Sequence, residues 1–583
     1  MRARPANRQR PSRLRQPSRA LALRILPGLI FLCISLIYFG RPVILHLTTR
    51  YIGAGPDPTN MFMWSLAWWP FALTHGVNPF LSGYIWSPLG FNITWLTSIP
   101  FLSLLMWPVT WLFGLVASYN VLMILTPALS AFTAFLLVRR LSGRWWIGLW
   151  GGYMFGFSSY EFSQMLGHSN LAFTALVPLL IYIIICLYER RNALSRWTPA
   201  VLIGLILAAQ YAISSEILAT LSLFGLCFLG IAWLVVPKER TALAWVLRSL
   251  LWGYAVAFLL ASPLLVYLFR DVPFSRVLVT PAFYSTDLLN LVIPTPVSLL
   301  GPQLSHISSS FTGNVSEQGA YLGIPFLALV LAAAWATWKN PWIRTATWTM
   351  AVVLVASLGP ILHVAGHTLG PLVHIGQHTF GVMPGALLTR LPLLGHALPS
   401  RFMLYVVLLA VIVASSYLRT VNWRLALSVA LLSVAVVLPN LGAGEGLWWS
   451  RLSVPRFIAS GQFHGVIPAG TTVLAFPAGN TGNWMFDQAW AGFPFRLEES
   501  YPYEPLAWAR LPIAAQLFSG RIAVGPVAVS EFQGMLAFGR VRAVVSLDPV
   551  PAALGRLVRE AGLLPLGTHG GVTEWQVPSA ISP

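Results

Sequence analysis

The sequence predicts an α-helical polytopic membrane protein with a small α/β domain at its C-terminus. Hydrophobic residues make up 56% of the 583 residues and charged residues only 9%, whereas a soluble domain carries about 25% charged residues. Apolar stretches of spanning length recur up to residue 441. Segment 442–583 is more polar and contains short strand-like runs. These observations indicate a transmembrane domain followed by an extramembrane domain.

The predicted transmembrane domain covers residues 24–441 and contains about eleven helices. Each span needs about 20 residues to cross about 30 Å of hydrocarbon. An arginine-rich tail, residues 1–23, precedes the first span. The predicted spans are 24–43, 119–138, 145–163, 171–188, 197–214, 216–236, 246–268, 320–338, 343–364, 402–419 and 423–441.

The positions of the basic residues predict the orientation in the cell membrane. Five basic segments fall in alternate loops between the spans, and an arginine-rich tail precedes the first span. If the N-terminus is cytoplasmic, all five segments are cytoplasmic, as the positive-inside rule requires. The C-terminal domain is then extracytoplasmic. This distribution explains the net charge of +19 without a nucleic-acid partner. The segments are 139–144, 190–196, 238–240, 339–344 and 419–424.

The outer face is expected to be built mainly from a large first loop, 44–118, and a second loop, 269–319. The run 98–116 is apolar enough to span, but one extra crossing would place every basic loop outside. We therefore expect interfacial helices here; a re-entrant segment, or two extra crossings with 61–74, are the alternatives. Tryptophans in this loop fit either sugar stacking or an interfacial belt: Trp64, Trp68, Trp69, Trp86 and Trp95.

The C-terminal domain, residues 442–583, shows the pattern of a small α/β fold. Strand-like runs lie at 472–476 and 541–546, a helix is expected at 551–562, and a last strand at 571–577. The domain is too short to be an obvious enzyme of its own.

Acidic residues are few, and most of those before the C-terminal domain fall on one side. Ionisable groups near lipid are costly and indicate function or pairing with arginines. Asp57 stands apart because Pro56 and Pro58 restrict its backbone directly after the first span; an exposed turn aspartate is the alternative. The six acids on the predicted outer face are Asp57, Glu161, Glu216, Asp271, Asp287 and Glu317.

Several short stretches of this chain form a recognisable pattern: 57–68, 78–79, 87–90, 119–120, 137–141, 167–168, 284–290, 317–323 and 399–402. With these stretches, the sequence resembles the GT-C superfamily of membrane glycosyltransferases, which use polyprenyl-phosphate sugars. The resemblance spans most of 24–441. It implies a large first outer loop with interfacial helices and a catalytic acid in that loop, which falls on Asp57 here. Some members have two adjacent acids there, whereas this chain has Asp57 followed by Pro58.

The function expected from this resemblance is transfer of a sugar from a polyprenyl-phosphate donor to an acceptor hydroxyl on a glycan, lipid or protein. Asp57 would be the general base of an inverting displacement. Arg401 is the first choice for binding the leaving phosphate, with Arg270 and Arg276 as alternatives and a snorkelling arginine as the structural explanation. Further substrate contacts are expected from His168, Asp287, Glu317 and His396.

No metal site or cofactor is predicted, although the sequence leaves a divalent cation open. His363 and His367 are four residues apart, but no third ligand or HExxH-like motif accompanies them. No P-loop, dinucleotide fingerprint or Ser-His-Asp arrangement is evident. The competing functions are a transporter or flippase of lipid-linked sugars, and a non-catalytic GT-C relative that binds lipid-linked glycans. Membrane lipids are expected partners in each case.

Overall fold

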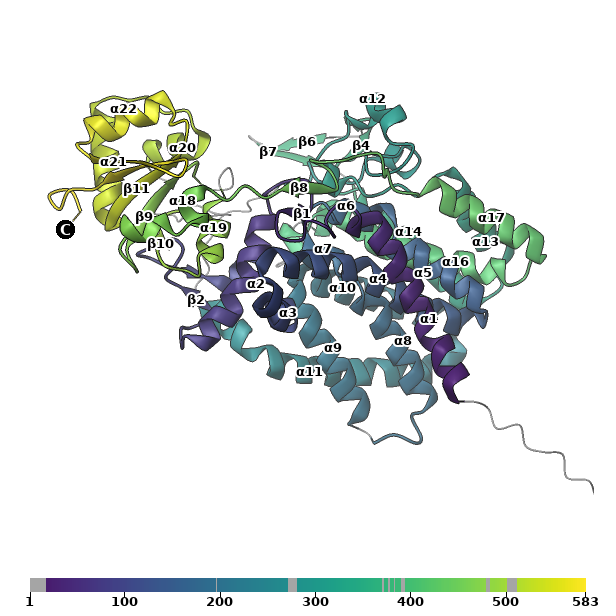
Figure 1. Ribbon diagram of the computed structural model, residues 1–583. Helices are drawn as coiled ribbons and strands as arrows, with labels where there is room; N and C mark the ends of the chain where they lie inside the picture. Colours follow the sequence, from purple (N-terminus) through teal and green to yellow (C-terminus); the bar gives the residue numbers. More distant parts are fainter. Residues whose placement is uncertain are drawn as a thin grey trace, which may run out of the picture.

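The computed structural model describes residues 17–195, 197–270, 280–369, 372–375, 378–381, 383–388, 394–478, 483–500 and 511–582. Most of the arginine-rich tail, Asp271 and Arg276 lie outside the described residues. A large helical body carries a smaller α/β unit at one end (Figure 1). The helical body is built from the first three quarters of the chain, and the α/β unit follows it in sequence.

Each of the eleven predicted spans contains a helix. Within the described part of the chain, five helical segments are long and apolar enough to cross a membrane: 115–142, 169–189, 215–235, 237–270 and 399–418. The other predicted spans contain shorter helices, so eleven crossings stay a prediction. The helices are α1 Pro17–Ser35 with η1 Leu36–Gly40, α4 Leu115–Ser142, α5 Trp145–Gly156, α8 Leu176–Glu189, α9 Thr198–Ile213, α10 Ser215–Val235, α11 Arg240–Arg270, α13 Ile324–Ala336, α14 Pro341–Ser357, α16 Met403–Leu418 and α17 Trp423–Val436.

Glycines on one face of α5 let it pack closely against α4. A Cβ atom at Gly152 would lie 2.6 Å from the carbonyl oxygen of Ala131, and one at Gly156 would lie 2.4 Å from the Ala131 nitrogen. Gly148 meets the Phe135 ring in the same contact. Small residues four apart allow such close backbone approach between apolar helices. Two short helices, α6 (Ser159–Gln164) and α7 (Ser169–Ala172), follow α5 in the chain. The contact between α4 and α5 therefore also fixes the position from which they start.

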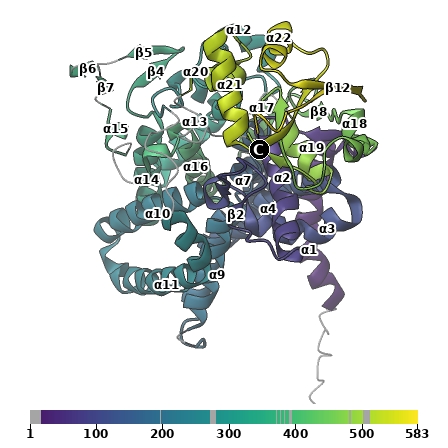
Figure 2. The same ribbon diagram turned by 90° about the vertical axis from the view of Figure 1, so that its left-hand side faces the viewer.

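The predicted outer loops lie together at one side of the helical body. In Figures 1 and 2, β4, β6 and α12 lie on the side that carries the C-terminal domain, and the start of α1 lies on the opposite side. An ion pair between Arg140 and Glu189 joins the ends of α4 and α8. The outer elements are η4 Leu288–Leu291, η5 Pro302–Leu304, α12 Ser305–Ser308, η6 Val315–Glu317, β4 Leu362–Val364, β5 His367–Leu369, β6 Leu372–Ile375, β7 His378–Gly381, α15 Gly385–Leu388, η7 Leu394–His396 and η8 Pro399–Phe402.

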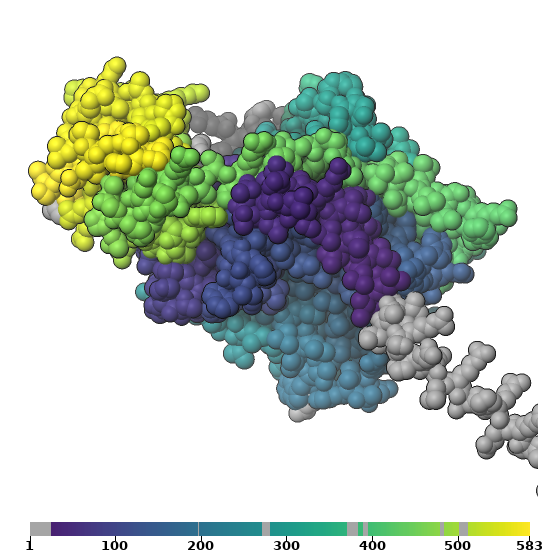
Figure 3. All heavy atoms as spheres, viewed as in Figure 1, coloured from purple at the N-terminus to yellow at the C-terminus, as the bar shows by residue number. Residues whose placement is uncertain are grey.

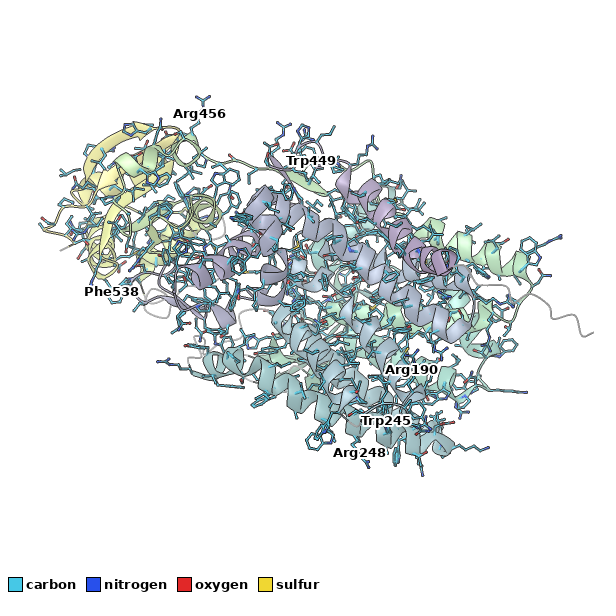
Figure 4. All side chains as sticks on the ribbon, turned by 60° about the horizontal axis from the view of Figure 1, so that its bottom comes forward. Arg190, Trp245, Arg248, Trp449, Arg456 and Phe538 are labelled. Carbon is cyan, nitrogen blue, oxygen red and sulfur yellow. The ribbon has the colours of Figure 1, made fainter. Side chains whose placement is uncertain are left out.

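The same two sides are visible from below. Arg190, from a predicted cytoplasmic loop, and Arg248, near the start of the predicted span 246–268, lie opposite Trp449 and Arg456 (Figure 4). The arrangement therefore agrees with the predicted grouping of loops into two faces; which face is cytoplasmic stays a prediction.

The first outer loop contains two helices of different character. Helix α2 (Thr59–Thr74) is buried along most of its length, whereas α3 (Pro100–Phe113) exposes Leu105, Trp111 and Phe113. An exposed apolar helix face is typical of contact with lipid, in line with the predicted interfacial helix. The remaining elements are β1 Arg50–Ile52, β2 Leu81–Ser82, β3 Phe91–Asn92 and η2 Ile93–Trp95.

The tryptophans of this loop do not form the predicted surface. Trp64 and Trp68 are 0% exposed, and Trp69 and Trp86 are also buried by other protein side chains. These four rings are packed inside the protein, so they form neither an exposed platform for sugars nor an interfacial belt.

The C-terminal domain is a five-stranded sheet with helices, in the strand order β10-β9-β11-β13-β12. Strands β10, β9 and β11 are parallel, while β13 is antiparallel to both of its neighbours. All four predicted elements are confirmed, as β9, β11, α22 and β13. The domain's elements are α18 Arg456–Ala459, η9 Gln462–Gly465, β9 Thr472–Phe476, α19 Trp484–Trp490, β10 Arg496–Leu497, α20 Pro512–Ser519, α21 Pro526–Phe538, β11 Val541–Leu547, α22 Ala552–Glu560, β12 Leu564–His569 and β13 Val572–Gln576.

Backbone pairing ties this domain to the first outer loop. Strand β8 (Trp449–Arg451) pairs with β1 in antiparallel register, Tyr51 opposite Ser450. The loop also extends the sheet edge, because Leu497 donates to the Tyr84 carbonyl at 2.8 Å and accepts from the Ser87 amide at 2.9 Å. Figure 3 shows the C-terminal domain projecting from the body beside the first loop.

Candidate functional site

Asp57 is an exposed side chain in the turn that leads into α2. The turn is held on both sides: the Ala54 amide donates to Leu166 O at 2.9 Å, and the Asn60 amide donates to Pro56 O at 2.7 Å. Pro58 is the residue directly before the first helical turn of α2, a place where proline's fixed φ and missing N–H cost little. The carboxylate therefore sits at the surface of a firmly anchored turn.

Segment 166–168 packs directly against this turn. Gly167 has φ +150°, and a Cβ atom there would lie 2.9 Å from Thr59 Oγ1 and 3.2 Å from Pro58 Cδ. Only glycine fits both the backbone conformation and the space. The Gly167-His168 pair named in the sequence resemblance is thus brought beside Asp57's turn by close backbone packing.

His168 follows this contact and precedes α7. Its amide donates to Gln164 O at 2.9 Å, and its Nδ1 is buried with no hydrogen-bond partner among the described residues. Burial of the imidazole lowers the pKa of His168 to about 4, with the Glu317 charge opposing and the Arg401 charge adding to this effect. His168 is therefore neutral near pH 7 and can exchange hydrogen bonds without carrying charge.

Arg401 joins three elements through two carboxylates. Its Nε and Nη2 donate to Glu317, at 3.0 Å and 2.5 Å to Oε1, and its Nη1 donates to Glu216 Oε2 at 2.5 Å. Ser400 Oγ also donates to Glu317, at 3.1 Å. Because a guanidinium has five N–H groups, two remain for other acceptors. The predicted alternative of acids paired with arginine holds for Glu216 and Glu317.

A buried polar segment lies between this bridge and the Asp57 turn. Gln164 Nε2 donates to Ser316 O at 2.8 Å, which joins α6 to η6. Glu161 accepts from Thr174 at 3.3 Å. The Oε1 atoms of Glu161 and Gln164 are buried and have no partner among the described residues. Buried polar atoms are nearly always paired in folded proteins, so this segment is a strong candidate for contact with a polar ligand.

Three other predicted site residues have different surroundings. Asp287 binds a hairpin turn: its carboxylate accepts from the amides of Leu289, Ala365 and Gly366 at 2.9, 3.1 and 2.7 Å. Arg270 and His396 are exposed. No described contact brings these three to the Asp57 turn, and Asp287 holds β4 and β5 in place.

Sequence reasoning gave little weight to Glu161 and Glu216, and passed over Gln164. Glu161 and Glu216 were identifiable as outer-face acids, but nothing local distinguishes an acid that pairs with an arginine 185 residues away. Gln164 carries no charge, so the search for ionisable residues near lipid could not identify it as a site residue. Within the described residues, no three His, Cys, Asp or Glu side chains group to hold a metal ion.

Fold and site together define a helical protein with helices long and apolar enough to cross a membrane and a carboxylate-rich site on the face that carries the C-terminal domain. No family model and no curated protein matches the chain. Solved structures to which it is similar include the oligosaccharyltransferase of Archaeoglobus fulgidus in the apo form, with 11% identity, coverage of 90% of this chain and 70% of the other, and a TM-score of 0.49.

Two further solved structures resemble the chain with similar identities and TM-scores. The archaeal oligosaccharyltransferase AglB from Archaeoglobus fulgidus, in complex with an inhibitory peptide and a dolichol-phosphate, has 12% identity, coverage of 98% and 75%, and a TM-score of 0.48. ArnT from Cupriavidus metallidurans, bound to undecaprenyl phosphate, has 12% identity, coverage of 97% and 99%, and a TM-score of 0.42. At TM-scores below 0.5 such likeness assigns no activity, so the function is inferred from this chain's own residues.

Proposed function

We propose that this protein is a membrane glycosyltransferase that moves a sugar from a polyprenyl-phosphate donor to an acceptor hydroxyl at the extracytoplasmic face. The observation that carries the proposal is the placement of Asp57. An exposed carboxylate stands at the start of a buried helix, beside Gly167 and His168. His168 in turn lies within the electrostatic reach of Arg401 and Glu317. We propose that Asp57 as base and these hydrogen-bonding groups serve one substrate site.

The proposed reaction is a direct displacement. Asp57 accepts the proton of the acceptor hydroxyl as the hydroxyl oxygen attacks the anomeric carbon. The new C–O bond forms while the bond from that carbon to the phosphate oxygen breaks, and the electron pair leaves with the lipid phosphate. The phosphate needs no general acid because it is already a good leaving group. Attack from the opposite side inverts the anomeric centre.

Arg401 is proposed to contact the leaving phosphate through the two N–H groups not used by Glu216 and Glu317. Its two carboxylate partners offset its charge, so we expect it to orient the phosphate more than to neutralise it. His168, neutral near pH 7, and the Oε1 atoms of Glu161 and Gln164 are proposed to receive sugar hydroxyls. Carbonyl and carboxylate oxygens only accept hydrogen bonds, which suits the O–H groups of a sugar.

Helix α3 is proposed to keep the site at the membrane surface. Its exposed apolar face, with Leu105 56% and Trp111 80% exposed, belongs to the same loop as Asp57. A lipid-linked donor has its reactive phosphate at the headgroup level, and α3 is proposed to lie at that level too.

The experiment that tests this proposal is a transfer assay with the purified full chain in lipid nanodiscs. Radiolabelled sugars are offered either as polyprenyl-phosphate sugars or as nucleotide sugars, with membrane glycan and lipid fractions as acceptors. We expect label in the acceptor fraction only with a lipid-phosphate donor, together with release of polyprenyl phosphate in equal amount. Transfer from nucleotide sugars alone would contradict the proposal, and so would movement of intact donor across the bilayer without transfer.

A further inference from the structure

One face of α2 packs against the C-terminal domain, with Tyr84 of the first loop beside it. Asn60, Trp64, Trp68 and Phe71 recur at spacings of four, four and three residues, which places them on one side of the helix. Trp64 and Trp68 stack with ring centroids 5.0 Å apart. This stripe begins three residues after Asp57, so whatever holds the stripe also holds the first turn of the helix that carries the proposed base.

Gln488 on α19 is the central polar contact of this face. Its Oε1 accepts from Trp64 Nε1 at 2.9 Å, and its Nε2 donates to Tyr84 O at 2.8 Å and to Phe495 O at 2.9 Å. The side chain is 0% exposed. One amide thereby joins helix α2, the following part of the first loop, and the C-terminal domain.

Two neighbouring contacts extend the same interface toward both ends of the stripe. Near Asp57, Asn60 Nδ2 donates to Asn483 Oδ1 at 2.7 Å. Farther along, Phe493 enters the aromatic face, with its ring centroid 5.8 Å from those of Trp64 and Trp68 and 4.4 Å from that of Phe71.

The backbone at Phe493 supports a specific role for this contact. Its φ of +60° lies in the left-handed region, which non-glycine residues rarely adopt and which tertiary contacts must hold. The turn after α19 thus holds the Phe493 ring against the α2 face.

We propose that Gln488 is a positioning residue for Asp57, and that the C-terminal domain sets the turnover of the outer-face site by fixing α2. Gln488 acts through Trp64 and does not touch the reacting atoms. The kinetic part of this inference rests on the proposed function, whereas the structural part does not.

The kinetic test compares Gln488→Leu with a matched control, Gln533→Leu. Gln533 also carries a bridging amide in the C-terminal domain, and its hydrogen bond among the described residues, to Ala561 O at 3.0 Å, stays within that domain. We expect Gln488→Leu to lower kcat about tenfold, with KM for the lipid donor within about twofold, and Gln533→Leu to leave both unchanged. Equal losses in the two variants would overturn the proposal, because they would indicate a general effect of domain stability.

A double-mutant cycle with Trp64→Phe separates positioning from folding. Phenylalanine keeps an aromatic ring but lacks the Nε1–H donor that Gln488 accepts. If Gln488 acts through Trp64, the double variant loses no more kcat than Gln488→Leu alone, because residues in one network are not additive. Fully additive losses would overturn the proposal.

Hydrogen exchange gives a readout that does not require activity. We expect faster amide exchange at residues 59–66 in Gln488→Leu and no change there in Gln533→Leu, with exchange in β9 and β11 unchanged in both. If exchange at 59–66 rises but no donor supports transfer, the proposed function fails and the positioning contact stands. If exchange at 59–66 stays at the wild-type rate in Gln488→Leu, the positioning contact itself is refuted.

Discussion

Arg401 shows at the scale of single residues how the outer face is held together. It bridges Glu216 at the start of α10 and Glu317 in η6, so one side chain joins segments that are far apart in sequence. Buried charges are tolerable only when they are paired and hydrogen-bonded. The bridge also leaves Arg401 oriented, which is the property that a phosphate contact needs.

Removing the cation should therefore cost much more stability than removing the whole bridge. In Arg401→Met the carboxylates of Glu216 and Glu317 lose their partner, and we expect a loss of about 3–5 kcal/mol. Thermal unfolding in detergent micelles measures this. The triple variant Arg401→Met/Glu216→Gln/Glu317→Gln should recover most of the loss, because no charge is left unpaired. A single variant as stable as wild type would contradict the bridge.

Glu498 in the C-terminal domain predicts a pH dependence of stability. Its side chain is 0% exposed and neither carboxylate oxygen has a hydrogen-bond partner among the described residues. Burial, with a smaller contribution from the Glu499 charge, holds the pKa of Glu498 well above its usual range. The folded protein thus keeps a proton that the unfolded chain releases above about pH 4.3, so this group lowers stability as pH rises.

Glu498→Gln should remove this fall in the free energy of unfolding with rising pH. We expect wild type to lose up to about 1.4 kcal/mol per pH unit from this group above pH 4.3, and the variant to gain stability relative to wild type at pH 8 compared with pH 5. Thermal unfolding of the full chain at both pH values is the measurement, with the exposed Glu560→Gln as the control. An identical pH slope in Glu498→Gln and wild type would disprove this assignment.

At the scale of elements, local patterns identified the helices and strands but not their partners. The apolar runs predicted helices in all eleven spans, and the strand-like runs predicted β9, β11 and β13. The spacing of Trp64, Trp68 and Phe71 shows a helix face, yet the sequence alone could not tell what covers it. The partner, Phe493, lies over 400 residues away, and no local signal links them.

The contact between α4 and α5 yields a prediction at this scale. A side chain at Gly156 would meet the Ala131 backbone at 2.4 Å, and backbone cannot move aside as a side chain can. We expect Gly156→Val to cost about 1–3 kcal/mol or more through overpacking, measured by thermal unfolding in detergent. Gly225→Val on α10, where a Cβ meets nothing within 4 Å, is the control. Equal stability of both variants would show that the helices are not closely packed.

At the scale of the whole molecule, β4, β6 and α12 of the predicted outer loops lie on the side that carries the C-terminal domain. The positive-inside rule predicts this grouping, because it acts on the whole set of loops and needs no knowledge of contacts. The candidate site was harder to predict. Asp57, Gly167-His168, Glu317 and Arg401 carry the family resemblance, but only the fold shows that segment 166–168 packs on the Asp57 turn while Asp287 binds a hairpin.

The contacts of the C-terminal domain also become visible only at the scale of the whole molecule. Its sequence suggested an appendage of unknown role, whereas the structure pairs it with the first loop through β1 and β8 and along the Trp64 face. Long-range pairing of this kind depends on complementary surfaces, and these are not encoded in the periodicity of either partner. The domain is therefore part of the scaffold of the proposed site.

The most direct test of the central claim is sugar transfer from a lipid-phosphate donor by wild type, Asp57→Asn and Asp548→Asn at equal expression. Asp548 is a matched control because it is also an exposed aspartate followed by proline, but it lies directly after β11 in the C-terminal domain. We predict a loss of about 100-fold or more in Asp57→Asn, since asparagine keeps the size of the side chain and removes the base, and wild-type transfer in Asp548→Asn. Wild-type transfer by Asp57→Asn would contradict the account.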